Sequence, residues 1–144
     1  MKFNELPLYE AVYDVVQQMI EDGESPGSDK WTMYESETLA RRIQQRLPIG
    51  APFTKGEMMD AWIRFRKSVG RKAELIVETA RKHGRHCFYR GRGLGECSDE
   101  LSIDRIIPGS RGGKYDIRNC VIACLKHNEQ RGDLSIEEYL SNAL

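Results

Sequence analysis

The stretch LSIDRIIPGSRGGKYDIRNCVIACLKHNEQRGD, residues 101–133, decides the fold. Two apolar runs flank a loop that is rich in Gly and other turn-forming residues, and a charged segment follows the second run. Short apolar runs bounded by turn residues are typical of β-strands. We therefore predict a strand, a loop, a second strand and a short helix.

Cysteine and histidine residues lie around this stretch at the spacing of metal ligands. Cys124 and His127 form a C-x-x-H pair, which at the start of a helix lets both side chains reach one ion. Cys87 and Cys97 are the natural second pair, so we predict a closed tetrahedral structural zinc site that clips a small fold together. The alternative is that all four cysteines are buried apolar residues, which is how we interpret the remaining one, Cys120.

Residues 87–133 resemble the HNH nuclease module, also called the ββα-metal finger. The positions that carry the resemblance follow in order: Ile103-Asp104, Pro108, Gly112-Gly113, Asn119, Asn128 and Arg131-Gly132-Asp133. The resemblance implies an α+β, mostly α chain, in which a helical region precedes a zinc-stapled finger. It also implies a metal-dependent endonuclease that hydrolyses phosphodiester bonds in DNA. The zinc half departs from the usual pattern, because Arg90 stands at the second Cys position, Cys97 follows an insertion and His127 replaces the last Cys.

The resemblance assigns roles to four residues. Asp104 is similar to the carboxylate that binds the catalytic Mg²⁺ or Mn²⁺, and Asn128 to the second protein ligand of that ion. Asn119 is similar to the Asn that ties the PGSRGGKYD loop through its side-chain amide. The family has a His after the Asp as general base, but this chain has Arg105. A guanidinium stays protonated, so Arg105 is expected to clamp the scissile phosphate instead.

Three interpretations follow from Arg105. In the first, the protein is an active enzyme whose base is a metal-bound hydroxide, or His83 or His86 folded over the site. In the second, it is a catalytically weak or inactive DNA-binding protein of the HNH fold. In the third, it is an interaction protein of a phage or mobile-element complex, whose acidic first helix docks a protein partner. We favour the first, because an inactive site has no physical need for the ion-facing carboxylate of Asp104.

The charge distribution favours contact with a polyanion on one side of the molecule. Residues 30–94 hold fifteen Lys or Arg against six acidic residues, whereas residues 1–29 hold one against seven. Within the finger, we expect Arg111, Lys114 and Arg131 to contact the sugar-phosphate backbone. A solvated charged surface is the plainer alternative.

Residues 1–84 are predicted to be a helical, nucleic-acid-positioning region, and residues 85–144 the finger with a closing helix. The first helix carries an apolar stripe from Leu8 to Ile20. Ser36 is expected to cap the second helix, and Thr54 with Glu57 to form a capping box for the third. That third helix is expected to bury Val69 and to be broken or weakened by Gly70.

The second and third helices could form a helix-turn-helix with residues 55–67 in the major groove, so that Arg64 and Lys67 contact DNA. Simple helix packing is the alternative. A capping box at Ser135 and Glu138 predicts a closing helix over residues 136–143. No apolar run is long enough for a membrane span, and no signal peptide is evident, so we expect a cytoplasmic protein with reduced thiols.

Overall fold

The structure is a computed structural model that describes residues 1–67 and 72–142. Val69 and Gly70, with their expected roles in the third helix, lie outside these residues. The chain divides into a helical unit, Glu5–Glu74, and a finger unit made of Met1–Asn4 and Leu75–Leu144. The boundary that we placed at residue 84 stays a prediction.

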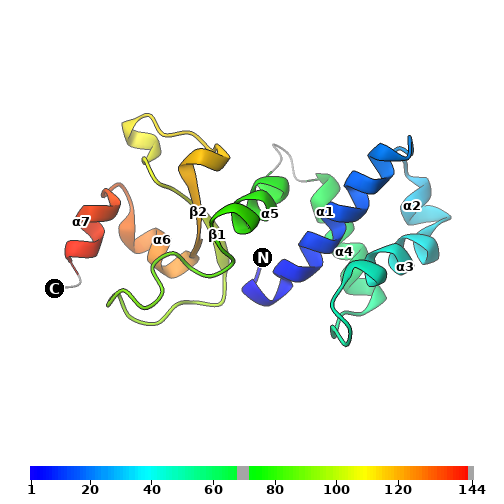
Figure 1. The fold of residues 1–144 in the computed structure, drawn as a ribbon, viewed down its shortest axis with the longest axis horizontal. Helices are drawn as coiled ribbons and strands as arrows, with labels where there is room; N and C mark the ends of the chain where they lie inside the picture. The colour runs from blue at the N-terminus through cyan, green and yellow to red at the C-terminus, as the bar shows by residue number, and fades with distance from the viewer. Residues whose placement is uncertain (68–71, 143–144) are drawn as a thin grey trace. The chain divides into compact units, whose positions relative to one another are not determined.

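Four helices make up the described part of the helical unit: α1 (Leu6–Glu21), α2 (Lys30–Met33), α3 (Ser36–Arg46) and α4 (Lys55–Lys67) (Figure 1). Helix α1 packs against α3 and α4, and α2 packs against α3. The apolar stripe of α1 is buried from Leu8 to Met19, but Ile20 is 57% exposed. Ile20 lies about 120° around the helix from Leu8, at the edge of the buried face.

One predicted helix cap is present in the helical unit and one is wrong. Glu57 N donates to Thr54 Oγ1 at 3.1 Å and Thr54 N donates to Glu57 Oε1 at 2.9 Å, which is the predicted capping box. Ser36 does not cap α3, because the helical ladder already starts one residue earlier, where Leu39 N donates to Glu35 O at 2.9 Å.

The finger unit has the predicted order of elements. Helix α5 (Lys72–His83) leads through a long irregular segment to β1 (Leu101–Arg105), which pairs antiparallel with β2 (Cys120–Cys124). Helix α6 (Leu125–Arg131) packs on both strands. Two 3₁₀ turns, η2 (Gly109–Arg111) and η3 (Ile117–Asn119), shape the loop between the strands. The mostly helical chain with a ββα finger is confirmed.

Both ends of the chain pack on the finger. Helix α7 (Ile136–Ser141) starts at the predicted capping box of Ser135 and Glu138, and Tyr139 is buried with its ring centroid 5.1 Å from that of Tyr89. A further turn, η1 (Phe3–Glu5), follows Met1 and Lys2, which lie beside the start of β1. There Phe3 N donates to Asp99 O at 3.0 Å. Among the described residues, no helix is long and apolar enough to cross a membrane.

Candidate zinc centre and nucleic-acid site

The structure brings the four predicted zinc ligands together. The ligand atoms of Cys87, Cys97, Cys124 and His127 all lie within 4.8 Å of one another. His127 Nδ1 lies 3.7 Å from Cys87 Sγ, 3.7 Å from Cys97 Sγ and 3.2 Å from Cys124 Sγ. A tetrahedral zinc ion with ordinary Zn–S and Zn–N bonds separates sulfur and nitrogen ligands by about 3.6 Å. The cluster therefore has the dimensions of a structural zinc site.

Hydrogen bonds orient two of these ligands. His127 Nε2 lies 3.0 Å from Leu94 O, and since a carbonyl only accepts, this nitrogen carries the proton and Nδ1 keeps its lone pair for a metal. Cys124 is the N-cap residue of α6, and its Sγ accepts from His127 N at 3.4 Å. The helix N-terminus thus holds the C-x-x-H pair in one place.

The pKa shifts of the three thiols explain why a cation would stabilise the cluster. Burial raises the pKa of Cys87, and burial together with the neighbouring thiol of Cys87 raises the pKa of Cys97. Burial alone would raise the pKa of Cys124 too, but hydrogen bonds from the backbone N–H groups of His127 and Ser98 lower it. Three close thiolates repel one another, and a zinc ion removes that cost. Cys120 is fully buried in β2 and lies outside the cluster.

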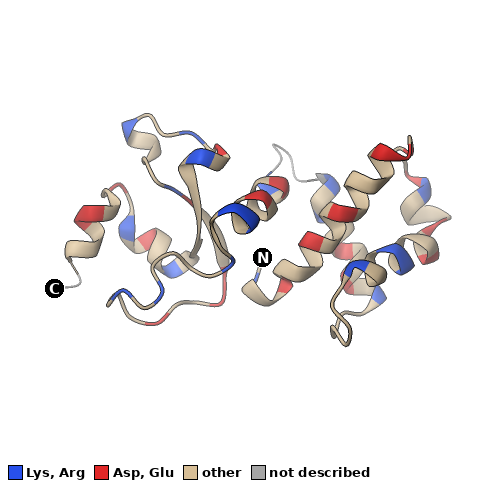
Figure 2. Ribbon diagram, viewed as in Figure 1, with Lys and Arg blue, Asp and Glu red and all other residues tan. Residues whose placement is uncertain are grey.

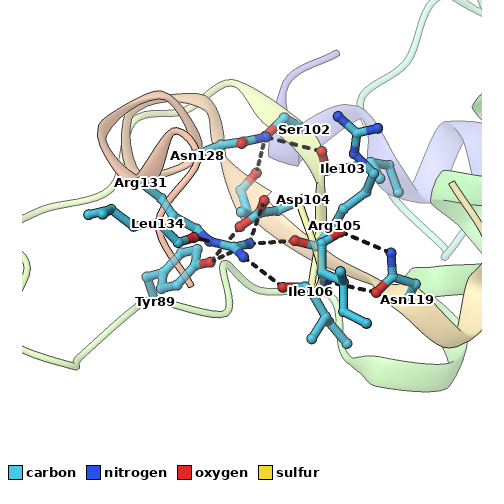
Figure 3. Close-up of polar contacts among 12 residues, drawn as sticks. Tyr89, Ser102, Ile103, Asp104, Arg105, Ile106, Asn119, Asn128, Arg131 and Leu134 are labelled. Atoms are coloured by element: carbon cyan, nitrogen blue, oxygen red, sulfur yellow. Dashed lines mark hydrogen bonds and ion pairs between the residues drawn. The ribbon is translucent and has the colours of Figure 1, made fainter. Parts of the chain in front are cut away.

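Asp104 lies inside the finger, and other side chains of the finger donate hydrogen bonds to its carboxylate (Figure 3). It is 6% exposed, and its side chain points from β1 toward α6. Its Oδ1 accepts from Arg131 Nη1 at 3.0 Å and its Oδ2 accepts from the hydroxyl of Tyr89. Each carboxylate oxygen has a second lone pair, so these two bonds leave acceptor capacity on Asp104.

Arg131 occupies a different place from the one that we predicted. It is 1% exposed, and its guanidinium donates to Leu134 O at 2.8 Å, to Ile106 O at 2.7 Å and to Arg105 O as well as to Asp104 (Figure 3). A buried guanidinium whose N–H groups are used by the chain's own oxygens does not contact a DNA backbone. Arg131 instead ties α6 to the end of β1 and to the turn before α7.

Asn128 shares the face of the hairpin that carries Asp104. Its Nδ2 donates to Ser102 Oγ at 2.9 Å and to Ile103 O at 3.0 Å, and Ser102 precedes Asp104 by two residues on β1. The carbonyl of Ile103 fixes which amide atom faces the strand. Within residues 1–67 and 72–142, no hydrogen bond reaches Asn128 Oδ1, so that oxygen is available to a ligand.

Arg105 points away from Asp104, toward the loop between the strands. Its guanidinium carbon lies 4.3 Å from the centroid of the Tyr115 ring. A Cβ atom added at Gly109 would lie 2.6 Å from its Nη1, so the guanidinium also sits against the loop backbone. Among the ion pairs of the described residues, none involves Arg105. Within the described part of the chain, this cation is therefore held in place without a carboxylate partner.

Asn119 ties the loop, as its predicted role requires. Its Oδ1 accepts from Ile107 N at 2.8 Å, and its Nδ2 donates to Ile107 O at 3.2 Å and to Lys114 O at 2.9 Å. Gly113 fits into this arrangement because it lacks a side chain, since an added Cβ would lie 1.6 Å from Ile107 O. The loop is therefore closed by one side chain and one glycine.

Among the residues that the structure describes, the side chains that contact Asp104 offer no uncharged base. Burial and the hydrogen bond to Asp104 raise the pKa of Tyr89, so its hydroxyl keeps its proton. His83 Nε2 lies 3.0 Å from Ile117 O, and His86 Nδ1 lies 3.2 Å from Arg90 Nη1. These contacts do not bring either histidine to Asp104.

The other predicted DNA contacts are distributed over both units. Lys114 is exposed in the loop, and Arg111 is exposed but pairs with Glu138 at 3.0 Å. Arg64 is exposed on α4, where a hydrogen bond with Tyr9 raises its pKa. Lys67 ends α4, and its side chain lies outside what the structure describes.

Three other cations of the helical unit pair with acidic side chains, in the pairs Arg42–Glu24, Lys55–Glu37 and Arg66–Asp29. Figure 2 shows this mixture of charges on the helices. The basic residues of this unit therefore form a less positive surface than the sequence count suggests. The proposed groove contact of α4 stays a prediction.

Comparison with known proteins agrees with this geometry. A model of the HNH endonuclease family matches residues 84–134. No curated protein and no solved structure matches the chain.

Proposed function

Because residues 84–134 are a domain of the HNH endonuclease family, we propose that this protein hydrolyses phosphodiester bonds in DNA with the help of a divalent cation. The observation that carries the proposal is the position of Asn128. Its amide is fixed by Ser102 and by Ile103 O, so an oxygen remains for a ligand on the face that carries Asp104. An amide oxygen and a carboxylate are hard donors that suit Mg²⁺ or Mn²⁺.

Asp104 and Asn128 would hold the cation, and Arg131 would hold Asp104. A bound divalent cation supplies Lewis acidity, which polarises a phosphate and lowers the pKa of water. Arg131 keeps the Asp104 carboxylate at the end of β1 through the 3.0 Å ion pair. Asn119 keeps the loop closed beside it through three hydrogen bonds. These two residues position the site and need not touch the substrate.

Arg105 would bind the phosphate. Its guanidinium is restrained by Tyr115 and by the backbone at Gly109, and no acidic side chain of the described residues neutralises it. A restrained guanidinium is suited to a phosphate, and it stabilises the negative charge that grows in the transition state. Because Arg105 cannot accept a proton, this chain supplies charge at the position where the family has a base.

Zinc would have a structural role. Its four ligands come from the segment before β1, from the end of β2 and from α6, so one ion connects the parts that carry Asp104 and Asn128. This arrangement fits a closed structural site with no open position for a substrate.

Plasmid nicking tests the proposal. Zinc-loaded protein is incubated with supercoiled plasmid in Mg²⁺ or Mn²⁺, in parallel with Asn128→Ala and with Glu129→Ala, an exposed neighbour on α6, as the matched control. We expect nicking that requires the cation, falls at least about 100-fold in Asn128→Ala and persists in the control. Nicking that needs no cation, or that Asn128→Ala leaves intact, would refute the proposed site.

A second candidate is DNA binding without cleavage, and it is favoured because no uncharged base contacts Asp104 within the described part of the chain. No nicking in either cation, with a gel shift that Arg105→Gln removes, would establish this function instead. The variant Arg105→His adds a test, because restoring a base where it is missing is expected to raise the nicking rate about 100-fold or more.

A further inference from the structure

Tyr115 is an exposed aromatic residue in the loop between β1 and β2. It is 58% exposed, and one face of its ring is covered by the Arg105 guanidinium at 4.3 Å. The guanidinium is itself backed by the Gly109 backbone, which leaves no room for a Cβ atom at that position. The ring is thus supported from one side and open to solvent over much of its surface.

Arg105 and two lysines supply positive charge near this part of the loop. Lys114 precedes it and is exposed, and Arg105 carries no acidic partner among the described residues. The contact of His83 Nε2 with Ile117 O, at 3.0 Å, brings the last turn of α5 against the same loop. That turn includes Lys82. The hydrogen bonds of Arg118 lower the pKa of the Asp116 carboxyl most, and the charge of Lys82 lowers it further. The exposed Tyr115 therefore lies in a loop that receives positive charge from β1, from α5 and from its own residue Lys114.

An exposed aromatic ring with cations nearby is complementary to a single nucleic-acid strand, which carries both phosphates and unstacked bases. Successive phosphates are attracted by the cations, and a base stacks on the ring. A base within a duplex already stacks on both faces, so the ring can take only a base that is unpaired or displaced from its helix.

We propose that Tyr115, backed by Arg105, is a stacking platform for an unpaired base, and that the substrate class is single-stranded or locally unpaired DNA. This inference rests on the proposed function and deepens it. Arg105 then has two tasks, since its flat face supports Tyr115 and its N–H edges bind the phosphate beside the stacked base. Lys114 and Lys82 bind the neighbouring phosphates.

Binding to three oligonucleotides of the same sequence tests the inference: a single strand, a matched duplex and a duplex with a central unpaired 2-aminopurine. The buffer has neither divalent cations nor chelator, so that DNA stays intact and zinc stays bound. We expect Tyr115→Leu to weaken binding of the single strand and the unpaired site about tenfold, and binding of the duplex less than twofold. Tyr115→Phe should bind as the wild type, and it should quench the 2-aminopurine equally well.

The control is Tyr34→Leu, because Tyr34 is 80% exposed in the helical unit and should leave every affinity unchanged. Equal loss on duplex and single strand, or no loss in Tyr115→Leu with full zinc content, would overturn the platform. Nicking assays separate this outcome from failure of the proposed function. If the Tyr115 effect is present but no cation supports nicking, the platform stands and the nuclease proposal fails. If nicking occurs and Tyr115→Leu changes no affinity, only the platform fails.

Discussion

Removing Arg131 tests how the finger is held together. The ion pair of Arg131 with Asp104 has an N–O distance of 3.0 Å, and its side chains are 1% and 7% exposed. The pair of Arg111 with Glu138 has the same 3.0 Å distance, but its side chains are 51% and 49% exposed. Removing one partner of a buried pair costs about 3–5 kcal/mol, because the other charge stays buried. An exposed pair contributes about 0.2–1 kcal/mol. We therefore expect Arg131→Met to destabilise the finger by at least about 3 kcal/mol and Arg111→Met by less than about 1 kcal/mol.

Amide hydrogen exchange of the zinc-loaded protein is the appropriate assay. Trp31 and Trp62 both lie in the helical unit, so tryptophan fluorescence does not report on the finger. A loss of 3 kcal/mol raises the exchange of amides that open with the finger roughly 100-fold. Amides of α1 should change little and serve as an internal reference. Exchange in β1 and β2 that rises less than about tenfold, or equally in Arg131→Met and Arg111→Met, would show that the buried network does not stabilise the finger.

A double variant, Arg131→Met with Asp104→Asn, isolates the contribution of the ion pair between these two residues to the stability of the finger. If the cost of Arg131→Met comes from the stranded carboxylate, the double variant should be more stable than the sum of the single effects predicts, by about 1–3 kcal/mol. Additive effects would assign the cost to the carbonyl groups of Ile106 and Leu134, which also lose a donor.

Three further substitutions, two of them with a matched control substitution, test the zinc site and the loop. Cys97→Ser should reduce bound zinc below one ion per chain by metal analysis, while Cys120→Ala, outside the cluster, should keep it. Asn119→Ala removes three hydrogen bonds and should speed proteolysis within residues 106–118, with a loss of about 1–3 kcal/mol; unchanged proteolysis would contradict its role in the loop. Gly113→Ala places a Cβ 1.6 Å from a backbone carbonyl oxygen and should cost about 1–3 kcal/mol or more. Gly27→Ala, with nothing within 4 Å, should cost little, and a similar loss in both would refute the steric argument.

The hairpin, the short helix and the C-x-x-H half of the zinc site could be predicted from sequence because each depends on local spacing. Apolar runs set β1 and β2, and the C-x-x-H spacing set Cys124 and His127 at the start of α6. The capping boxes at Thr54 and Ser135 are also local, since each depends on a residue three positions ahead. The prediction that Ser36 caps α3 was wrong because a serine near the start of a helix does not determine which residue accepts the first backbone hydrogen bond of that helix.

Contacts between distant segments could not be predicted in the same way. The pairing of residues 1–3 with residues 99–101 joins the two ends of about a hundred residues of chain, and no local pattern encodes it. The burial of Arg131 was missed because arginine is usually exposed. One signal was available: Arg131 follows Asn128 by three residues, so both share one face of α6, and Asn128 was predicted to face the ion.

The burial of Arg131 also bears on when a cation would bind. Alternation along β1 separates Asp104 from Arg105, so the carboxylate faces α6 and the guanidinium faces the loop. Arg131 pairs with Asp104, and the proposed ion site therefore has about zero net charge before substrate arrives. Asn128 adds an oxygen but no charge. A divalent cation favours a site with negative charge, and a DNA phosphate that approaches Asp104 and Asn128 would supply it. On the proposed function, this chain would therefore bind the cation together with DNA.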